Sequence, residues 1–175
     1  MDISQRALVA LQHGRLDDAE ALVSESLAIR RQVQDRRGEG VDTAIQGGIA
    51  LARGQLLEAR HLYERALAIA LEVENQRGVG ANYHHLGVIA EQLGEVAQAG
   101  DLLRQSLAIA RAVESEPDIA RGLLSLGQFL IVHQGSRDEG CNMVAEAARL
   151  YQRMGRREAA HAEETVAKLG CARRG

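Results

Sequence analysis

The side chains best suited to acid–base or metal chemistry are scattered along this chain. Six histidines are present: His13, His61, His84, His85, His133 and His161. None has the spacing of a ligand set such as His-Glu-x-x-His. His84 and Glu91 resemble a base with its orienting carboxylate, but on one helix they would lie about 10 Å apart along the axis, whereas a direct hydrogen bond needs about 3 Å. We therefore expect no metal, no cofactor and no catalysis; an enzyme with His84 as its acid or base is a remote alternative.

Other reactive motifs are also absent from the sequence. It contains no Gly-rich phosphate loop and no serine or cysteine nucleophile motif. Cys141 and Cys171 fit no metal-binding spacing such as Cys-x-x-Cys, and we expect reduced thiols. No stretch approaches the roughly 20 apolar residues of a bilayer span, and the N-terminus has no basic region followed by an apolar run. These features predict a cytoplasmic protein that does not bind membranes.

The composition is that of an ordinary soluble protein and narrows the choice of partner. Hydrophobic residues make up 46% of the 175 residues and charged residues 26%. Aromatic residues make up only 2%, so platforms for stacking bases or sugars are scarce. The net charge of −3 gives no broad basic surface. We therefore expect no direct binding of nucleic acid.

The same short phrase returns every 40 residues. Leu-Ala-Ile-Arg at 27–30 is followed by Leu-Ala-Ile-Ala at 67–70 and again at 107–110. Glycines keep the same spacing: Gly14, Gly54 and Gly94, with Gly135 following after 41 residues. Periods of this size indicate an array of stacked structural units.

The pattern inside each repeat is helical. Ala59, Tyr63, Ala66 and Ala70 lie three or four positions apart, which is typical of one apolar helix face. A glycine before each such segment is well suited to end the preceding helix. Pro117 is well placed in the first turn of a helix. The predicted pairs are about 1–13 with 15–35, 39–53 with 55–75, 79–93 with 95–114, and 117–134 with 136–154, followed by a ninth helix at about 156–169.

Glycines also recur within the first helix of the later repeats, at Gly47, Gly87 and Gly127. Glycine inside a helix costs about 1 kcal/mol relative to alanine. We interpret these glycines as points where a neighbouring helix approaches closely.

These small and large positions resemble those of a tetratricopeptide repeat (TPR). The residues that carry the resemblance are Gly87, Gly94, Ala99, Leu103 and Ser106, matched by Gly47, Gly54, Ala59, Tyr63 and Ala66. The 40-residue period is similar to the longer variety in kinesin light chains and bacterial signal-transduction regulators. The resemblance implies an all-α, right-handed α-α superhelix of four helix pairs plus a C-terminal capping helix. It would form a single domain, 1–175, with repeats at about 1–36, 37–76, 77–116 and 117–155 and the capping helix at 156–170.

In such an array the first helices of the repeats line a concave groove. The inward positions would be Ser4, Leu8, Leu11, Val41, Ala44, Gly48, Leu51, Ala81, His84, Val88, Glu91, Arg121, Leu124, Gln128 and Ile131. Arg121 is the only cation among them, which argues against a clamp for a C-terminal carboxylate. His85 is expected to face elsewhere. We predict a non-catalytic scaffold that binds a protein or peptide segment, either an amphipathic helix or an extended chain.

The predicted contact residues of that groove are Leu51, His84, Val88, Glu91, Arg121, Leu124, Gln128 and Ile131. One alternative leaves His84 merely solvated and Glu91 paired locally. A second is a regulatory module that senses a small molecule or signalling peptide in a pocket between Leu51, His84, Val88 and Gln128. The first helix begins without a lead-in, so we expect that the natural protein continues before Met1 or that a partner, including a second copy in a homodimer, covers this edge.

Overall fold

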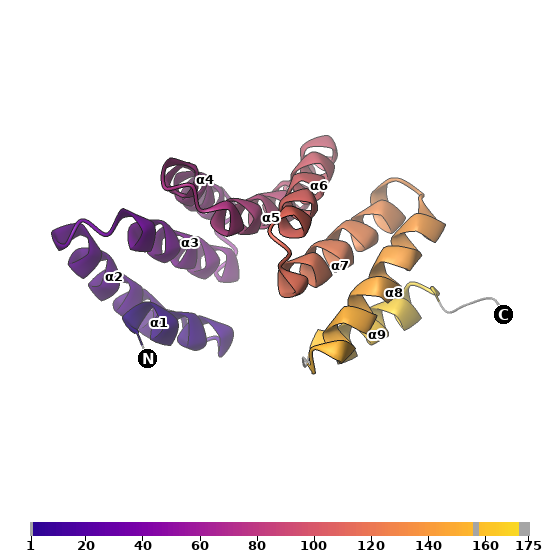
Figure 1. Cartoon of the computed structure of the whole chain (residues 1–175), viewed down its shortest axis with the longest axis horizontal. Coiled ribbons are helices and arrows are strands. Elements are labelled where there is room, and N and C mark those ends of the chain that lie inside the picture. Colours follow the sequence, from indigo (N-terminus) through magenta and orange to yellow (C-terminus); the bar gives the residue numbers. More distant parts are fainter. Residues whose placement is uncertain (1, 156–157, 172–175) are drawn as a thin grey trace. The chain divides into compact units, whose positions relative to one another are not determined.

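The computed structural model describes residues 2–155 and 158–171, and in these ranges the chain forms nine helices and no strand (Figure 1). The helices are α1 (Ile3–Gln12), α2 (Leu16–Gln32), α3 (Arg36–Ala52), α4 (Leu56–Glu72), α5 (Gln76–Gln92), α6 (Val96–Ala112), α7 (Glu116–His133), α8 (Arg137–Arg153) and α9 (Glu158–Lys168). The predicted all-α class is confirmed. Residues 156–157, where the capping helix was predicted to begin, lie outside the described ranges.

The helices pack as consecutive pairs in two compact units, residues 1–89 and 90–175, with the boundary inside α5. In the first unit α1 packs against α2, α2 against α3, and α3 against α4. In the second, α6 packs against α7, α7 against α8, and α8 against α9. Each unit is described by itself below, and the single domain over 1–175 stays a prediction.

Local hydrogen bonds explain where the helices begin and end. α3 and α5 start three residues earlier than predicted, because Asp35 and Asn75 accept hydrogen bonds from the backbone N–H groups of Gly38 and Gly78. At the end of α3, Gly54 adopts a φ of 75° and donates to the carbonyl of Leu51. The next residue donates back to the carbonyl of Ala50, which completes a Schellman turn.

The interior glycines mark close helix crossings, as predicted. A Cβ atom on Gly47 would lie 3.0 Å from the ring of Tyr63 on α4. A Cβ atom on Gly127 of α7 would lie 2.8 Å from the carbonyl oxygen of Gly140 on α8. Gly140 itself would bring a Cβ to 2.5 Å from the carbonyl of Gly127, which is why glycine replaces the alanine of the other repeats.

Gly127→Ala therefore forces the backbones of α7 and α8 apart. We expect it to lower the free energy of unfolding by about 1–3 kcal/mol, measured by urea denaturation. Gly48→Ala is the contrasting variant, because its Cβ would meet the flexible end of Leu11 at 2.9 Å and the hydroxyl of Tyr63 at an ordinary 3.4 Å. In that variant, the gain of about 1 kcal/mol in helix propensity offsets the cost of displacing the Leu11 side chain. Equal destabilisation by the two substitutions would contradict the close crossing at Gly127.

The first repeat contains a set of polar side chains centred on one arginine, which we call the Arg30 cluster: Asp2, Ser4, Ser26, Arg30, Asp35 and Asp42. Arg30 Nε donates to Asp42 Oδ2 at 3.0 Å, and Nη2 donates to Asp2 at 2.9 Å and to Ser4 at 3.0 Å. Nη1 donates to Asp35. The cluster thus ties α1, α2 and α3 together.

The charges in the Arg30 cluster hold one another ionised. The N–H of Gly38, aided by the Arg30 guanidinium, lowers the pKa of Asp35 despite partial desolvation. Desolvation acts to lower the pKa of Arg30, but the hydrogen bond to Asp35 and the charge of Asp42 outweigh it and raise that pKa. Asp42 has no exposed surface, and Nε of Arg30 lies 3.0 Å from its carboxylate.

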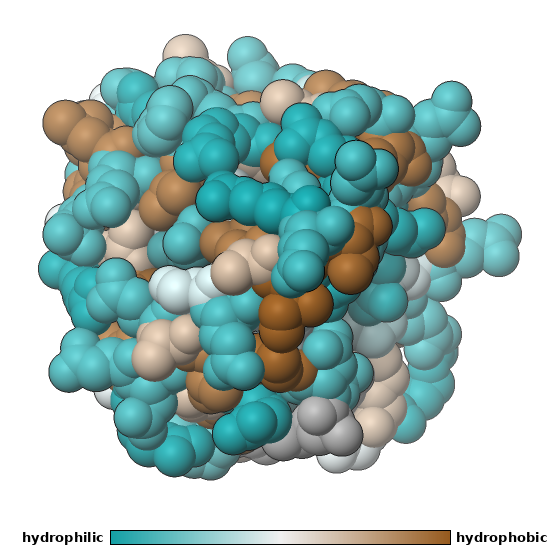
Figure 2. Space-filling view, turned by 90° about the vertical axis from the view of Figure 1, so that its left-hand side faces the viewer, coloured by the Kyte–Doolittle hydropathy of each residue, from teal (hydrophilic) through white to brown (hydrophobic). Residues whose placement is uncertain are grey.

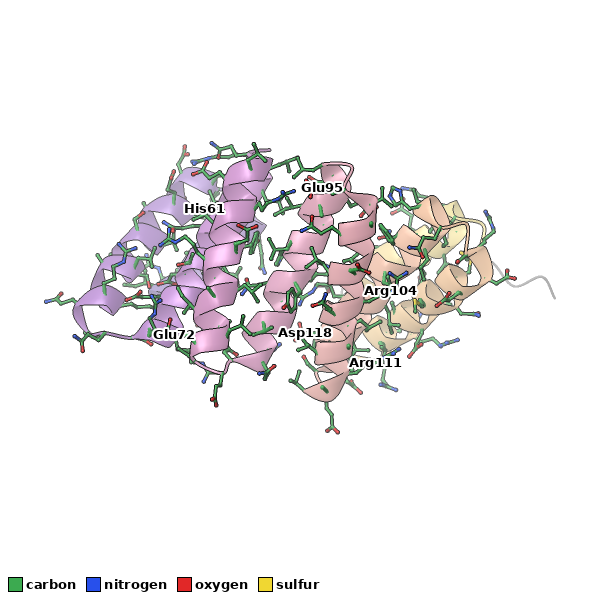
Figure 3. All side chains as sticks on the ribbon, turned by 90° about the horizontal axis from the view of Figure 1, so that it is seen from above. His61, Glu72, Glu95, Arg104, Arg111 and Asp118 are labelled. Atoms are coloured by element: carbon green, nitrogen blue, oxygen red, sulfur yellow. A yellow bond between two sulfur atoms is a disulfide. The ribbon has the colours of Figure 1, made fainter. Side chains whose placement is uncertain are left out.

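Exposed ion pairs connect neighbouring helices at the surface. Glu72 of α4, labelled in Figure 3, accepts from Arg36 of α3 at 2.8 Å. The end of the molecule seen in Figure 2 is mostly hydrophilic, with apolar residues between the polar ones. Leu8 of α1 is 43% exposed. Apolar side chains, Leu8 among them, are therefore exposed on the first unit, and the homodimer stays a prediction.

Candidate functional site

The candidate site is an apolar groove along α3 in the first unit. It encloses a cavity of about 450 Å³. Its wall is formed by residues of α1, α3, α4 and α5 and the turn before α5: Leu8, Leu11, Arg37, Gly40, Val41, Ala44, Ile45, Gly48, Leu51, Tyr63, Ala66, Ile69, Ala70, Val73, Asn75, Gly78, Ala81, Asn82 and His85. We call this the α3 groove. Arg37 is the only charged residue in its wall, if His85 is neutral.

The groove follows one helix face for most of the length of α3. The α3 residues in the wall run from Arg37 to Leu51 at spacings of one and three, which places them on one side of the helix. The fourteen residue-to-residue steps of helix from Arg37 to Leu51 extend about 21 Å. Among the inward positions expected from the sequence, the structure places Leu8, Leu11, Val41, Ala44, Gly48, Leu51 and Ala81 in this wall.

Ser4 and His84 occupy different places from those expected. Ser4 is buried and hydrogen-bonds Ser26 at 3.0 Å instead of lining the groove. His84 is only 7% exposed, which corrects its interpretation as a solvated groove residue. His85 lines the groove and stacks on Tyr63 with ring centroids 4.6 Å apart, although the sequence interpretation placed it elsewhere. The face of α5 that carries Asn82 and His85 borders the α3 groove. His84 lies on another face of the same helix.

The predicted contact residues after 89 belong to the second unit. Leu124, Gln128 and Ile131 are half-buried and share a face of α7. Arg121 donates to Asp118 at 2.7 Å. Oε1 of Glu91 lies 2.9 Å from Nε2 of His133 on α7, a contact between helices rather than a local pairing. Leu51 lines the α3 groove and Val88 does not. A binding groove through all eight predicted residues stays a prediction.

The two cysteines form a disulfide, which contradicts the expectation of reduced thiols. Cys141 lies at the start of α8 and Cys171 just beyond the end of α9, and their Cα atoms are 5.1 Å apart. The two cysteines are 30 positions apart in the sequence, and they meet because α8 packs against α9 with its beginning beside the end of α9. Spacing in the sequence does not show this, because it depends on the lengths of α8, α9 and their connection.

The described part of the chain contains neither a metal-binding cluster nor a membrane-spanning helix. In residues 2–155 and 158–171, no group of three or more His, Cys, Asp or Glu side chains is placed to hold a metal ion. Within the same residues, no helix is both long and apolar enough to cross a lipid bilayer.

Comparison with known proteins identifies the repeat. Residues 41–112 match the tetratricopeptide repeat family. The nearly identical TPR-like repeats of a kinesin light chain from Podosopora anserina share the fold, with 21% identity and a TM-score of 0.65 over 99% of this chain and 96% of that one. Residues 41–112 thus match tetratricopeptide repeats, and the chain shares the TPR-like fold of that structure. Within this fold, the α3 groove is bounded by the first helices of the helix pairs, α1, α3 and α5, together with α4.

Two further solved structures share the fold of this chain. A single-residue variant of the same Podosopora anserina repeats has 21% identity and a TM-score of 0.64, covering 95% of this chain and 92% of that one. BtubC (BKLC) from P. vanneervenii has 18% identity and a TM-score of 0.70, covering 97% and 79%. At these identities the likeness shows the fold alone. No curated protein sequence matches the chain.

Proposed function

We propose that this chain is a non-catalytic binding module that holds a segment of another protein in the α3 groove. TPR proteins are generally interaction scaffolds, which supports this class of function. The observation that carries the proposal is the continuous apolar wall, in which small residues such as Ala44 and Gly48 leave space between α1, α4 and α5. Apolar surface that remains accessible in this way is typical of a binding site.

The size of the groove favours an extended segment over a whole helix. A helix with its side chains is about 10–12 Å across, and a cavity of 450 Å³ extending along α3 takes side chains rather than a helix. An extended segment of about six residues spans the roughly 21 Å of the groove. The partner is therefore a peptide or an exposed loop with apolar side chains.

A ligand-sensing role is the second candidate. The cavity volume lies within the range of about 300–1,000 Å³ that small-molecule sites occupy, and the wall combines apolar residues with a few polar groups. In this candidate the α3 groove replaces the pocket that the sequence predicts between Leu51, His84, Val88 and Gln128. The cytoplasmic location also stays a prediction. The disulfide contradicts the reduced thiols that were expected from the sequence together with that location.

Filling the groove tests the proposal. Peptides are selected from a random library displayed on phage against the intact chain, and their Kd values are measured by isothermal titration calorimetry. Ala44→Trp places a large ring in the wall, and we expect it to weaken these peptides at least about tenfold because it occupies their space. Ala52→Trp, on an exposed part of the same helix, is the matched control.

The two tryptophan variants must retain the helical circular dichroism of the parent chain. Loss of affinity in Ala44→Trp with unchanged affinity in Ala52→Trp supports binding in the α3 groove. Equal affinities for all three proteins would show that the peptides bind elsewhere.

A further inference from the structure

Part of the α3 groove is the space that an arginine fills in the preceding repeat. Each residue of the Arg30 cluster has a counterpart 40 positions later: Arg30 corresponds to Ala70, Asp35 to Asn75, and Asp42 to Asn82. Ala70, Asn75 and Asn82 all lie in the wall of the groove. Replacement of arginine by alanine therefore leaves a slot, bounded by these three residues, which we call the Asn82 slot.

The backbone around the two positions is alike. A Cβ atom on Gly38 would overlap the side chain of Arg30. Its counterpart on Gly78 would lie 3.3 Å from the Cβ of Ala70 and 2.6 Å from Nδ2 of Asn75. Both glycines thus place the helix start against the residue at this position, and alanine in the second repeat lacks the long side chain that Arg30 has in the first.

Asn82 carries an amide in the wall of the cavity, and the residue is only 4% exposed. Its counterpart Asp42 accepts from Arg30 at 3.0 Å, whereas Ala70 offers no side-chain donor in the second repeat. A few polar groups in the wall of a largely apolar cavity fix the orientation of a ligand, so the amide of Asn82 points to a ligand group.

The charges of the Asn82 slot indicate which head group it takes. The carboxylates of Asp35 and Asp42 are replaced by amides, so a cation in the position of the Arg30 guanidinium would lack its counter-charges. Asp42 itself is engaged by Arg30 and is not in the groove wall. The amide of Asn82 can donate one hydrogen bond and accept another. A neutral group that does the same is its complement.

We propose that the Asn82 slot binds the carboxamide of a glutamine side chain from the segment held in the α3 groove, which rests on the proposed function. The N–H of Asn82 donates to the glutamine carbonyl, and the glutamine N–H donates to the carbonyl of Asn82. The methylene groups of the glutamine lie against Ala66 and Ala70. No bond is made or broken, so the slot contributes selectivity for this side chain.

The first experiment measures head-group selectivity without any partner. The intact, disulfide-bonded chain is labelled with nitrogen-15, and hexanamide, hexanoate and hexylguanidinium are titrated separately. We expect hexanamide to shift the Asn82 side-chain amide signals and the backbone signals of Gly78, and to bind about tenfold more tightly than the two charged probes, the value of one or two neutral hydrogen bonds. Equal binding of all three probes, or no binding, would overturn the proposal.

Variants locate the effect in the slot. The triple variant Ala70→Arg, Asn75→Asp and Asn82→Asp rebuilds the residues of the first repeat and fills the slot, so hexanamide shifts are lost. Asn82→Ala keeps the slot open but removes the amide, and we expect it to lose the preference for hexanamide over hexanoate. Asn142→Ala, at an exposed position on α8, is the matched control. Unchanged preference in Asn82→Ala would refute the role of Asn82, even if the triple variant fails to fold.

The second experiment tests the peptide as the source of the carboxamide. Peptides selected on the intact chain are synthesised with each glutamine replaced by leucine, glutamate or arginine. We expect one glutamine whose replacement weakens binding about tenfold to the parent chain but not to Asn82→Ala. Glutamine-independent peptides that still lose affinity in Ala44→Trp would overturn the slot and leave the proposed function intact. A further outcome is that hexanamide binds but the selected peptides bind equally well to the parent chain and to Ala44→Trp. That outcome would overturn the proposed function and would show that a peptide is not the source of the carboxamide.

Discussion

Replacing Arg30 by alanine should lower the free energy of unfolding of the first unit by about 3–5 kcal/mol. Asp42 has no exposed surface, and one of its oxygens is paired with Arg30 while Oδ1 has no partner in the described part of the chain. Removal of the guanidinium leaves a buried carboxylate without a counter-charge, a much larger loss than that of an exposed ion pair. Urea denaturation followed by circular dichroism measures the change.

Two controls separate the buried charge from other effects of the Arg30 substitution. Arg31→Ala removes an exposed arginine from the same helix, and we expect a change below about 0.5 kcal/mol. Adding Asp42→Asn to Arg30→Ala removes the stranded charge and should restore a large part of the stability. Hydrogen exchange should show the loss in α1, α2 and α3, which the Arg30 cluster joins. If Arg30→Ala is no more destabilising than Arg31→Ala, the charge of Asp42 is not held by Arg30.

Reduction of the Cys141–Cys171 disulfide should have the second largest effect. The bond links positions 30 apart, and the loop that it closes contains most of α8 and all of α9. The entropy of closing a loop of this size in the unfolded chain corresponds to about 3–4 kcal/mol. We expect the reduced chain to lose that stability in the helical hairpin of α8 and α9, seen as faster amide exchange in α9.

The Cys141→Ser, Cys171→Ser double variant gives the same comparison without a reducing agent. Its α9 amides should exchange as fast as those of the reduced parent chain, whereas the amides of α3 and α4 in the first unit should be unaffected. Exchange in α9 that is identical in the oxidised, reduced and double-serine proteins would show that the disulfide does not stabilise the hairpin.

Much of the candidate site follows from the repeat period. The period predicts Val41, Ala44, Gly48 and Leu51 on one inward face of a helix, and all four line the α3 groove. This inference worked because helix geometry alone decides which side chains share a face. The expectation that His85 faces elsewhere was wrong, because a helix between two neighbours turns different sides to each, and the period does not say which side borders a cavity.

The Asn82 slot is not predicted from the sequence, although its signal is present there. Aligning the repeats shows that Arg30 becomes Ala70 while Asp42 becomes Asn82, so one side chain shrinks and the charges disappear together. What alignment does not show is that these residues meet. Arg30 and Asp42 are on α2 and α3, and only the packing of those helices brings Nε to within 3.0 Å of the carboxylate.

The sequence by itself determined the features that depend on a few neighbouring residues: the helical class, the 40-residue register, and the helix ends at glycines such as Gly54, whose left-handed backbone is inexpensive only for glycine. The tertiary structure decided the contacts between helices. It paired Cys141 with Cys171, buried Asp42 beside Arg30, and left Asn82 in an open cavity. These depend on helix rotation and distance across the fold, which arise from the packing of whole faces and leave no local pattern in the chain.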